Sequence, residues 1–332
     1  MSTAVSDLNE ANVTLFQNRV SGLINAISLK SLLLPVLGLG VFLLIWSFAA
    51  SRIDTSLGQF PGPVQVYSQV LSLADEHKAE LKKEQAFYER QEKRNAKKLE
   101  KNPEATVKIR KYTGKETFLD QIITSLKTVL AGFLIASLIA IPVGIICGLS
   151  DAVYQAINPL IQIFKPVSPL AWLPLITMIV SAVYVGDDPF FEKSFLNSAL
   201  TVALCCLWPT LINTAVGVAN VDKNLLDVSR VIKLPTVTHI RKIILPASIP
   251  MVFTGLRLSL ATGWMVLIAA EMLSQNPGLG KFVWDEFQNG SSNSLARIMV
   301  AVVAIGVIGF FLDRIILMIQ RWASWDKLAV LR

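Results

Sequence analysis

Long apolar runs separated by polar segments dominate the chain. A helix needs about 20 mostly apolar residues to cross the hydrocarbon core of a bilayer, so runs of that length predict membrane-spanning helices. The predicted spans are approximately residues 31–50, 122–149, 163–185, 195–219, 248–273 and 296–319. The third span contains Pro166, Pro169 and Pro174, which favour its division into two pieces. The pattern therefore predicts an all-α, polytopic membrane protein with about six transmembrane helices.

Composition agrees with a membrane location. Hydrophobic residues make up 53% of the 332 residues and charged residues only 17%, against roughly 25% in soluble domains, and the mean hydropathy is +0.53. The net charge of +7 would point to nucleic acid in a soluble protein. In a membrane protein, basic loops on the cytoplasmic side explain it more simply, so we expect a lipid bilayer and no nucleic acid as partner.

Charge in the short loops sets the predicted orientation. The loop at 220–247 is basic, which places it in the cytoplasm, and six spans then put both termini there as well. The first apolar run follows a long polar lead without a cleavage site, so we expect it to remain as an anchor. The resulting parts are a cytoplasmic N-terminal segment, a first span, an extracytoplasmic region, a five-helix core and a cytoplasmic tail. Their bounds are 1–30, 31–50, 51–121, 122–322 and 323–332.

The extracytoplasmic region contains a charged insertion at 74–116. From Ala74 to Lys101 there is neither Gly nor Pro, and strong helix formers dominate, so a helix is predicted. Pro103 follows its end, and the alternation over 106–112 predicts a short strand. Two interpretations remain open, a solvated spacer and a docking surface for an extracytoplasmic protein.

The polar, basic stretch at 227–246 interrupts the apolar core. A helical run ends at Ile232, Lys233 to Pro235 breaks it, and a second helical run starts at Thr236. We expect its apolar residues to rest on the ends of the spans, with Arg230, Lys233 and His239 facing the cytoplasm. A helix pair of this kind would project as a knob that fits a socket on another protein.

Catalytic motifs are missing from the sequence. It has no phosphate-binding loop of the Gly-x-x-x-x-Gly-Lys-Ser/Thr form and no local nucleophile, paired-carboxylate or metal-binding pattern. Cys147, Cys205 and Cys206 fall within apolar runs, where thiols act as small hydrophobic groups. We therefore expect a non-catalytic subunit with no metal site and no cofactor of its own.

The stretch at 227–246 resembles the cytoplasmic signature loop of binding-protein-dependent ABC importer permeases. That loop starts with Glu-Ala-Ala, has a Gly after three further residues, and ends in Ile-x-Leu-Pro. Asp227-Val228-Ser229 matches the start and Ile243-Ile244-Leu245-Pro246 the end, with Asp227 in place of Glu and Lys233 in place of Gly. Lys is disfavoured at the positive φ that Gly adopts readily. The resemblance assigns ATPase coupling to Asp227, Val228, Ser229, Arg230, Lys233, Leu234, Pro235, His239, Leu245 and Pro246.

Further motifs resemble one branch of that family, the permeases for nitrate, nitrite, bicarbonate, cyanate and alkyl sulfonates. The motifs are Phe60-Pro61-Gly62-Pro63, the stretches at 165–174 and 254–259, Ala269-Ala270-Glu271-Met272-Leu273, and the Gly-Leu-Gly stretch at 278–285. The last two of these motifs, at 269–273 and 278–285, resemble nitrate-type members most. The resemblance covers about 31–72 and 120–322, and the charged insertion is absent from shorter members.

The resemblance implies the type I ABC importer permease architecture in a bacterial inner membrane. Its implied partners are a second copy of the permease, two ABC ATPase subunits that hold ATP and Mg, and an extracytoplasmic solute-binding protein. The implied cargo is a small inorganic anion, nitrate or nitrite first, with bicarbonate, cyanate, or an alkyl sulfonate such as taurine as alternatives. A stand-alone secondary transporter is a more distant alternative, and it predicts internal repeats that the sequence does not show.

Polar and aromatic residues within the predicted spans are candidates for the translocation path. Lys127 would draw anions towards the path, whereas Glu271 would repel them and is expected to pair with a neighbour. The full candidate set is Lys127, Trp172, Ser259, Thr262, Trp264 and Glu271.

Overall fold

The computed structural model describes residues 29–55, 58–102, 107, 109–185 and 191–323. The chain divides into two compact units, which meet between Tyr67 and Ser68. The predicted cytoplasmic segments at 1–30 and 323–332 lie almost wholly outside the described residues.

The first unit contains the N-terminal apolar helix. Helix α2 (Leu29–Ala50) has mostly exposed apolar side chains, including Leu44 and Phe48, as expected for a helix that lipid surrounds. A two-stranded antiparallel hairpin follows, β1 (Asp54–Thr55) and β2 (Gly58–Gln59). The indole N–H of Trp46 donates to the carbonyl of Pro61 at 3.2 Å, which ties the helix to the segment after the hairpin.

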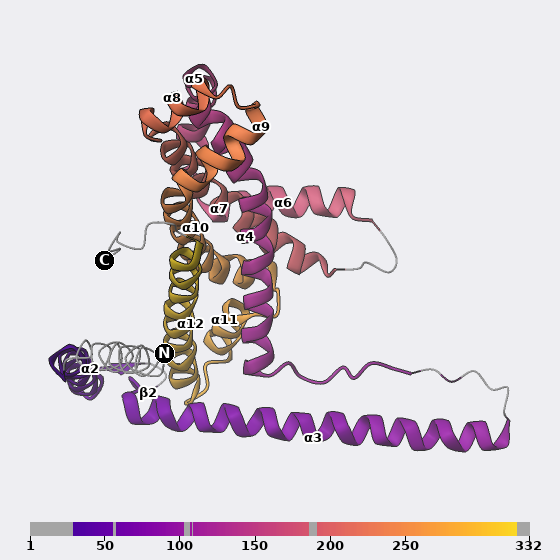
Figure 1. Cartoon of the computed structure of the whole chain (residues 1–332). Helices are drawn as coiled ribbons and strands as arrows, with labels where there is room; N and C mark the ends of the chain where they lie inside the picture. The colour runs from indigo at the N-terminus through magenta and orange to yellow at the C-terminus, as the bar shows by residue number, and fades with distance from the viewer. Residues whose placement is uncertain (1–28, 56–57, 103–106, 108, 186–190, 324–332) are drawn as a thin grey trace, which may run out of the picture. The chain divides into compact units, whose positions relative to one another are not determined.

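Three long helices build the core of the second unit. Helices α4 (Phe118–Leu149), α7 (Lys193–Ala219) and α10 (Leu245–Ser274) pack side by side, with α7 in contact with both of the others (Figure 1). A Cβ on Gly144 would lie 2.8 Å from the carbonyl oxygen of Leu211, and one on Gly148 would lie 2.6 Å from that of Ala215. Small residues at this spacing let helix backbones approach closely, which is how membrane helices associate.

The described helices agree with the predicted spans. Five are long and apolar enough to cross a membrane: α2, α4, α7, the continuous helical stretch Thr236–Ser274, and α12 (Ser294–Ala323). A sixth span is obtained if α5 (Asp151–Phe164) and α6 (Pro169–Val183), which meet at a bend of 100°, count as one broken span. The break at residues 165–168 falls near the start of the predicted span 163–185, which therefore consists mainly of α6, and α5 lies mostly before that span and was not predicted as part of it. The break follows Phe164, and the Ser168 hydroxyl accepts a hydrogen bond from the Leu170 amide at the start of α6.

The charged insertion is a longer helix than predicted. Helix α3 (Pro63–Lys101) starts about three turns earlier than expected and has 39 residues, so it is about 58 Å long. The predicted strand at 106–112 is wrong as far as the structure describes it, because 107 and 109–112 carry no strand pairing, and 106 and 108 lie outside the described residues. Residues 109–117, here called the return segment, run back along α3 instead.

The return segment forms hydrogen bonds with side chains of α3 and not with a second strand. The Gln91 amide donates to the carbonyl of Arg110 at 3.0 Å and accepts from its amide at 2.7 Å, as a strand partner would. The Tyr112 hydroxyl donates to Glu80 at 2.7 Å, and this hydrogen bond, with Lys83 nearby, lowers the pKa of the Glu80 carboxyl. The same bond to Glu80 raises the pKa of Tyr112.

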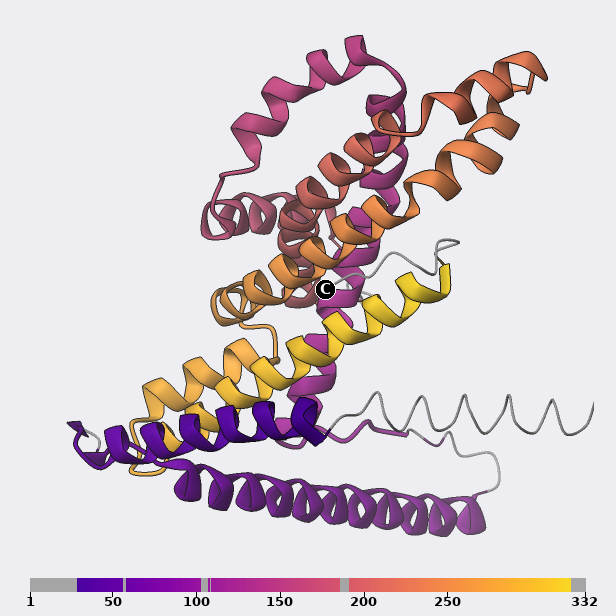
Figure 2. The same cartoon turned by 60° about the vertical axis from the view of Figure 1, so that its left-hand side comes forward.

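The two ends of the second unit carry different structures. Helices α8 (Lys223–Val231) and α9 (Thr236–His239) lie at one end of the α4–α7–α10 bundle, and α3 crosses the opposite end (Figure 1). The rotated view shows the same separation (Figure 2). The short helix α11 (Leu279–Asn289) packs against α10 and α12 at the α3 end.

Candidate functional site

Residues 222–246, here called the α8–α9 element, form the predicted helix pair. The Asp222 carboxylate accepts a hydrogen bond from the Asn224 amide at 2.9 Å and caps α8. Pro235 precedes the first turn of α9 as its N-cap residue, and its carbonyl accepts a hydrogen bond from the His239 amide at 2.8 Å. A π-helix, η1 (Ile240–Ile244), follows without a break and leads into α10, a feature that the sequence did not predict.

The turn between α8 and α9 keeps a glycine-like backbone although it contains lysine. Lys233 has φ of +51°, in the left-handed region. Its amide donates to the carbonyl of Arg230, and the Leu234 amide donates to that of Ser229, each at 3.1 Å. These two bonds satisfy the last carbonyls of α8, so the turn geometry is retained with a side chain where glycine is usual.

A buried contact joins the two helices of the element. The Ser229 hydroxyl is 4% exposed and lies 2.8 Å from Nδ1 of His239, with which it shares a hydrogen bond. The same hydroxyl donates to the carbonyl of Leu226 at 2.9 Å. His239 is therefore half-buried between the helices rather than turned fully to solvent, and the pair is held as one body.

The outward surface of the element is apolar with basic residues at its margin. Leu226 and Ile244 pack against Val218 and Val221 at the bundle end, as expected. Of the other expected anchors, Ile240 and Ile243 are half-buried, whereas Leu225, Val228 and Ile232 are exposed. Among the described residues, Arg230 forms an ion pair with Asp227 of the same helix, at 3.1 Å. The outward apolar residues are Leu225, Val228, Val231, Ile232 and Val237, of which Val231 is 80% exposed. Exposed apolar surface of this kind is typical of a contact with another protein or with the membrane.

The remaining predicted coupling residues line the base of the element. Leu234, Leu245 and Pro246 are half-buried, whereas Lys233 and Pro235 are exposed. A cavity of about 390 Å³ lies under the turn, lined among others by Gly148, Ser229, Lys233, Leu234 and His239.

Glu271 is fully buried at the α3 end of the bundle. The Ser125 hydroxyl lies 2.9 and 2.8 Å from its two carboxylate oxygens, and the Gly280 amide donates to it at 3.0 Å. The Leu279 amide in turn donates to the Ser125 oxygen at 2.8 Å. No basic side chain in the described ranges pairs with Glu271, so its neighbours are a hydroxyl and the backbone at the start of α11. The carboxylate thus joins α4, α10 and α11.

The other path candidates are distributed over three helices. Ser259 is buried and donates to the carbonyl of Cys206, and the indole of Trp264 donates to that of Ile305 at 2.9 Å. Thr262 donates to the carbonyl of Leu258 within its own helix at 2.8 Å.

Lys127 is exposed on α4, and the ring of Trp172 on α6 lies 5.7 Å from that of Phe164. Trp264 also borders a cavity of about 160 Å³ between α10 and α12. Their part in a path stays a prediction.

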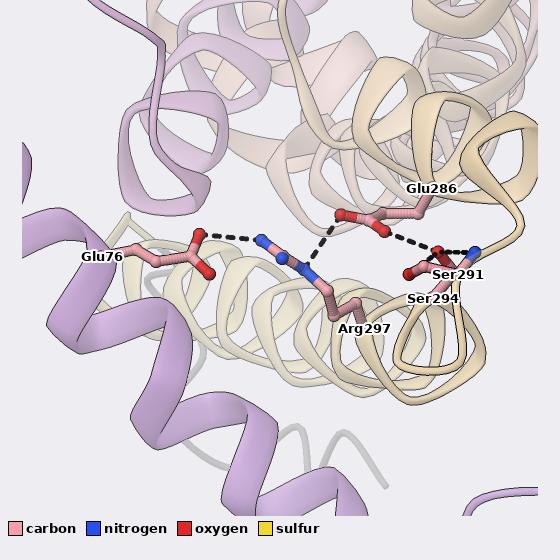
Figure 3. Close-up of polar contacts among 5 residues, drawn as sticks. All are labelled: Glu76, Glu286, Ser291, Ser294 and Arg297. Carbon is pink, nitrogen blue, oxygen red and sulfur yellow. Dashed lines mark hydrogen bonds and ion pairs between the residues drawn. The ribbon is translucent and has the colours of Figure 1, made fainter.

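Two charged contacts were missed by sequence reasoning. Arg257 on α10 pairs with Asp313 on α12 at 2.9 Å, beside the cavity that Trp264 borders. The signal was available, because opposite charges in two predicted spans favour an ion pair. Arg297 on α12 lies 2.8 Å from Glu76 on α3 and 2.9 Å from Glu286 on α11, and the Ser294 hydroxyl donates to Glu286 at 3.0 Å (Figure 3). This second contact anchors α3 to the core.

Comparison with solved structures defines the fold. A chain of the MetNI methionine ABC transporter, in an inward-facing conformation, matches with a TM-score of 0.52 at 14% identity, over 62% of this chain and 96% of that one. The bundle therefore has the fold of a type I ABC importer permease, with its apolar helix pair at one end.

Residues 140–324 match the family of binding-protein-dependent transport system inner membrane components. The chain belongs to this family and is the membrane permease subunit of an ABC importer. The nitrate import permease protein NrtB of Leptolyngbya laminosa is 35% identical over 59% of this chain and 65% of its own length, slightly less than two thirds. The bicarbonate transport system permease protein CmpB of Synechococcus elongatus is 31% identical over 89% of this chain and 90% of its own length.

Proposed function

We propose that this permease moves a small inorganic anion, nitrate or nitrite first, across the inner membrane at the expense of ATP hydrolysed on partner subunits. The observation that carries the proposal is the α8–α9 element, which presents exposed apolar side chains and is held as one body by the Ser229–His239 contact. A rigid element transmits displacement, whereas a flexible one would absorb it. ATP and Mg belong to the partner ATPases in this scheme, and this chain holds no cofactor.

The assembly that fits this role is a pair of such chains with two ATPases on the α8–α9 side and a solute-binding protein on the α3 side. The α8–α9 element then faces the cytoplasm, and both termini lie there too. The family description, which makes transport depend on a binding protein, supports the last partner.

Nitrate is proposed first because nitrate import permeases stand among the most similar relatives, at 35% and 33% identity. Bicarbonate is the second candidate, because the bicarbonate permease matches over far more of this chain, 89% against 59%. Both are small monovalent anions, so a polar path without a fixed charge could serve either.

Coupling is tested in proteoliposomes that contain the permease, its ATPases and its binding protein. Val231→Asp is the most informative change, since this side chain is 80% exposed and contributes little to the fold of the chain itself. We expect transport-coupled ATP hydrolysis to fall about tenfold or more, because an unpaired charge in an apolar contact costs several times RT. Lys233→Glu and Pro235→Gly should also lower it. Lys193→Glu, which makes the same charge change at an exposed lysine outside the element, serves as control.

The proposal fails if the ATPases neither bind the chain nor respond to Val231→Asp. Substrate choice is measured in the same vesicles by uptake of labelled nitrate, bicarbonate, cyanate and taurine. Uptake of bicarbonate alone would replace nitrate by the second candidate and leave the coupling mechanism intact.

A further inference from the structure

The exposed side of α3 carries a continuous stripe of positive charge. At about 100° per residue, Lys83, Arg90, Lys93, Arg94 and Lys97 fall within about 100° of one another around the helix, and all five are exposed. The acidic residues Glu84, Glu89 and Glu92 project outside this sector. We call these five residues the basic stripe.

The stripe has few partners within the chain. Lys83 pairs with Glu80 at 3.0 Å, but Lys93, Arg94 and Lys97 form no ion pair among the described residues. Arg90 and Arg94 are four residues apart, as are Lys93 and Lys97, and like charges at that spacing destabilise a helix. An anionic partner laid along the stripe would remove this repulsion.

Apart from Lys83, which pairs with Glu80, the stripe forms no ion pair with the rest of its unit among the described residues. The return segment packs on the face of Glu80, Tyr88 and Gln91, through hydrogen bonds to Tyr112 and Arg110. Leu73, which is 4% exposed, is on that attached face, about 100° around the helix from the stripe. Arg90, Lys93, Arg94 and Lys97 therefore lie on a part of the helix that the return segment does not cover.

The anchor of α3 makes the stripe a fixed part of the permease. Arg297 is 18% exposed, and it joins Glu76 of α3 to Glu286 of α11 and thereby to α12 (Figure 3). His77 adds a second tie, through Nδ1 at 2.6 Å from the Thr117 hydroxyl just before α4. A protein bound to the stripe would thus contact an element that is connected to the core helices.

We propose that the basic stripe is a docking surface for an acidic face of the solute-binding protein. This inference rests on the proposed function, in which the end of the bundle opposite the α8–α9 element faces that protein; α3 lies at this end (Figures 1 and 2). A membrane surface fits less well. Leu81, Tyr88 and Leu99 are the large apolar side chains exposed on α3 beyond Leu71, too few for a helix that inserts into the headgroup region.

The test measures association of the purified cognate binding protein with the complete transporter in nanodiscs of neutral phosphatidylcholine. Replacing Arg90, Arg94 and Lys97 together by Glu should lower the association rate constant about tenfold at low salt and flatten its salt dependence, because opposite charges steer encounter. Lys97→Glu alone should give part of the loss. Lys78→Glu, which makes the same charge change about 100° around the helix, should leave the rate nearly unchanged.

Equal association rates for the triple variant and the unmodified transporter would overturn the proposal. Binding to vesicles is measured in parallel, with phosphatidylglycerol against phosphatidylcholine. A triple variant that loses phosphatidylglycerol binding but keeps its binding-protein association would assign the stripe to lipid and also overturn the proposal. ATP hydrolysis without binding protein should be unchanged in all of these α3 variants, which separates this test from the test of the α8–α9 element. The proposed function is contradicted only if Val231→Asp leaves transport-coupled ATP hydrolysis unchanged.

Discussion

Lys233→Gly should stabilise the turn of the α8–α9 element. A residue with a side chain in the left-handed region costs about 1–2 kcal/mol, and Lys233 has φ of +51°. Glycine removes that cost but loses about 0.5–1 kcal/mol more conformational freedom on ordering. The net gain is about 1 kcal/mol, which corresponds to an approximately fivefold smaller equilibrium constant for local opening.

Hydrogen exchange followed by mass spectrometry on residues 223–246 measures this opening directly. The amides of Lys233 and Leu234 are the informative ones, because both donate to carbonyls at the end of α8. Lys233→Ala is the matched control, since it removes the charge and keeps a Cβ at positive φ, and it should exchange as the unmodified protein does. Equal exchange rates in Lys233→Gly and Lys233→Ala would contradict a backbone cost at Lys233.

Three further outcomes concern the α3 end of the second unit. Gly278→Ala places a Cβ in steric conflict with the Glu271 carboxylate, so the free energy of unfolding should fall by about 1–3 kcal/mol and the midpoint of thermal denaturation should fall with it. An unchanged midpoint would contradict this close packing. Arg297→Met leaves Glu286, a buried carboxylate, without its cation, and a loss of about 2 kcal/mol is expected by the same measurement, whereas Arg297→Lys should lose less. Because the folded pKa of Glu80 is lowered, its hold on the return segment should be complete at neutral pH and lost as the pH falls below 4.5. The protection factors of that segment, which are corrected for the intrinsic pH dependence of amide exchange, should then fall, and protection factors that do not change with pH would contradict this.

The spans were predictable because they depend on local composition. Runs of about 20 apolar residues predicted α4, α7, α10 and α12, and the prolines of the third span anticipated the 100° bend between α5 and α6. The start of α3 was not predicted, because the helix begins at the second proline of a Pro-Gly-Pro stretch, which is typical of a turn, and because its first turns contain many apolar residues. The strand expected near residue 110 was wrong because alternation does not say whether the partner is a strand or, as with Gln91, a helix side chain.

The site was predictable in outline and not in its contacts. The helix, turn and helix of residues 222–246 follow from helix breakers and from the family pattern. That Ser229 meets His239, and that Glu271 is satisfied by Ser125 and a backbone amide, depends on residues up to 146 positions apart in sequence. No local pattern contains such information. The π-helix at Ile240–Ile244 is equally invisible, since it depends on how the chain enters the bundle.

The helical stretch Thr236–Ser274 consists of α9, η1 and α10, and it runs from the turn at Lys233 to the buried Glu271. Its 39 residues span about 58 Å, so a tilt of only about 5° about one end displaces the other end by about 5 Å. One helical stretch therefore joins the two ends of the bundle, and in the proposed function a small rotation at the α8–α9 end becomes an ångström-scale shift beside α11. In that scheme, the π-helix η1 and the prolines Pro246 and Pro250, where such a helix can bend, would limit how much of the displacement reaches the opposite end.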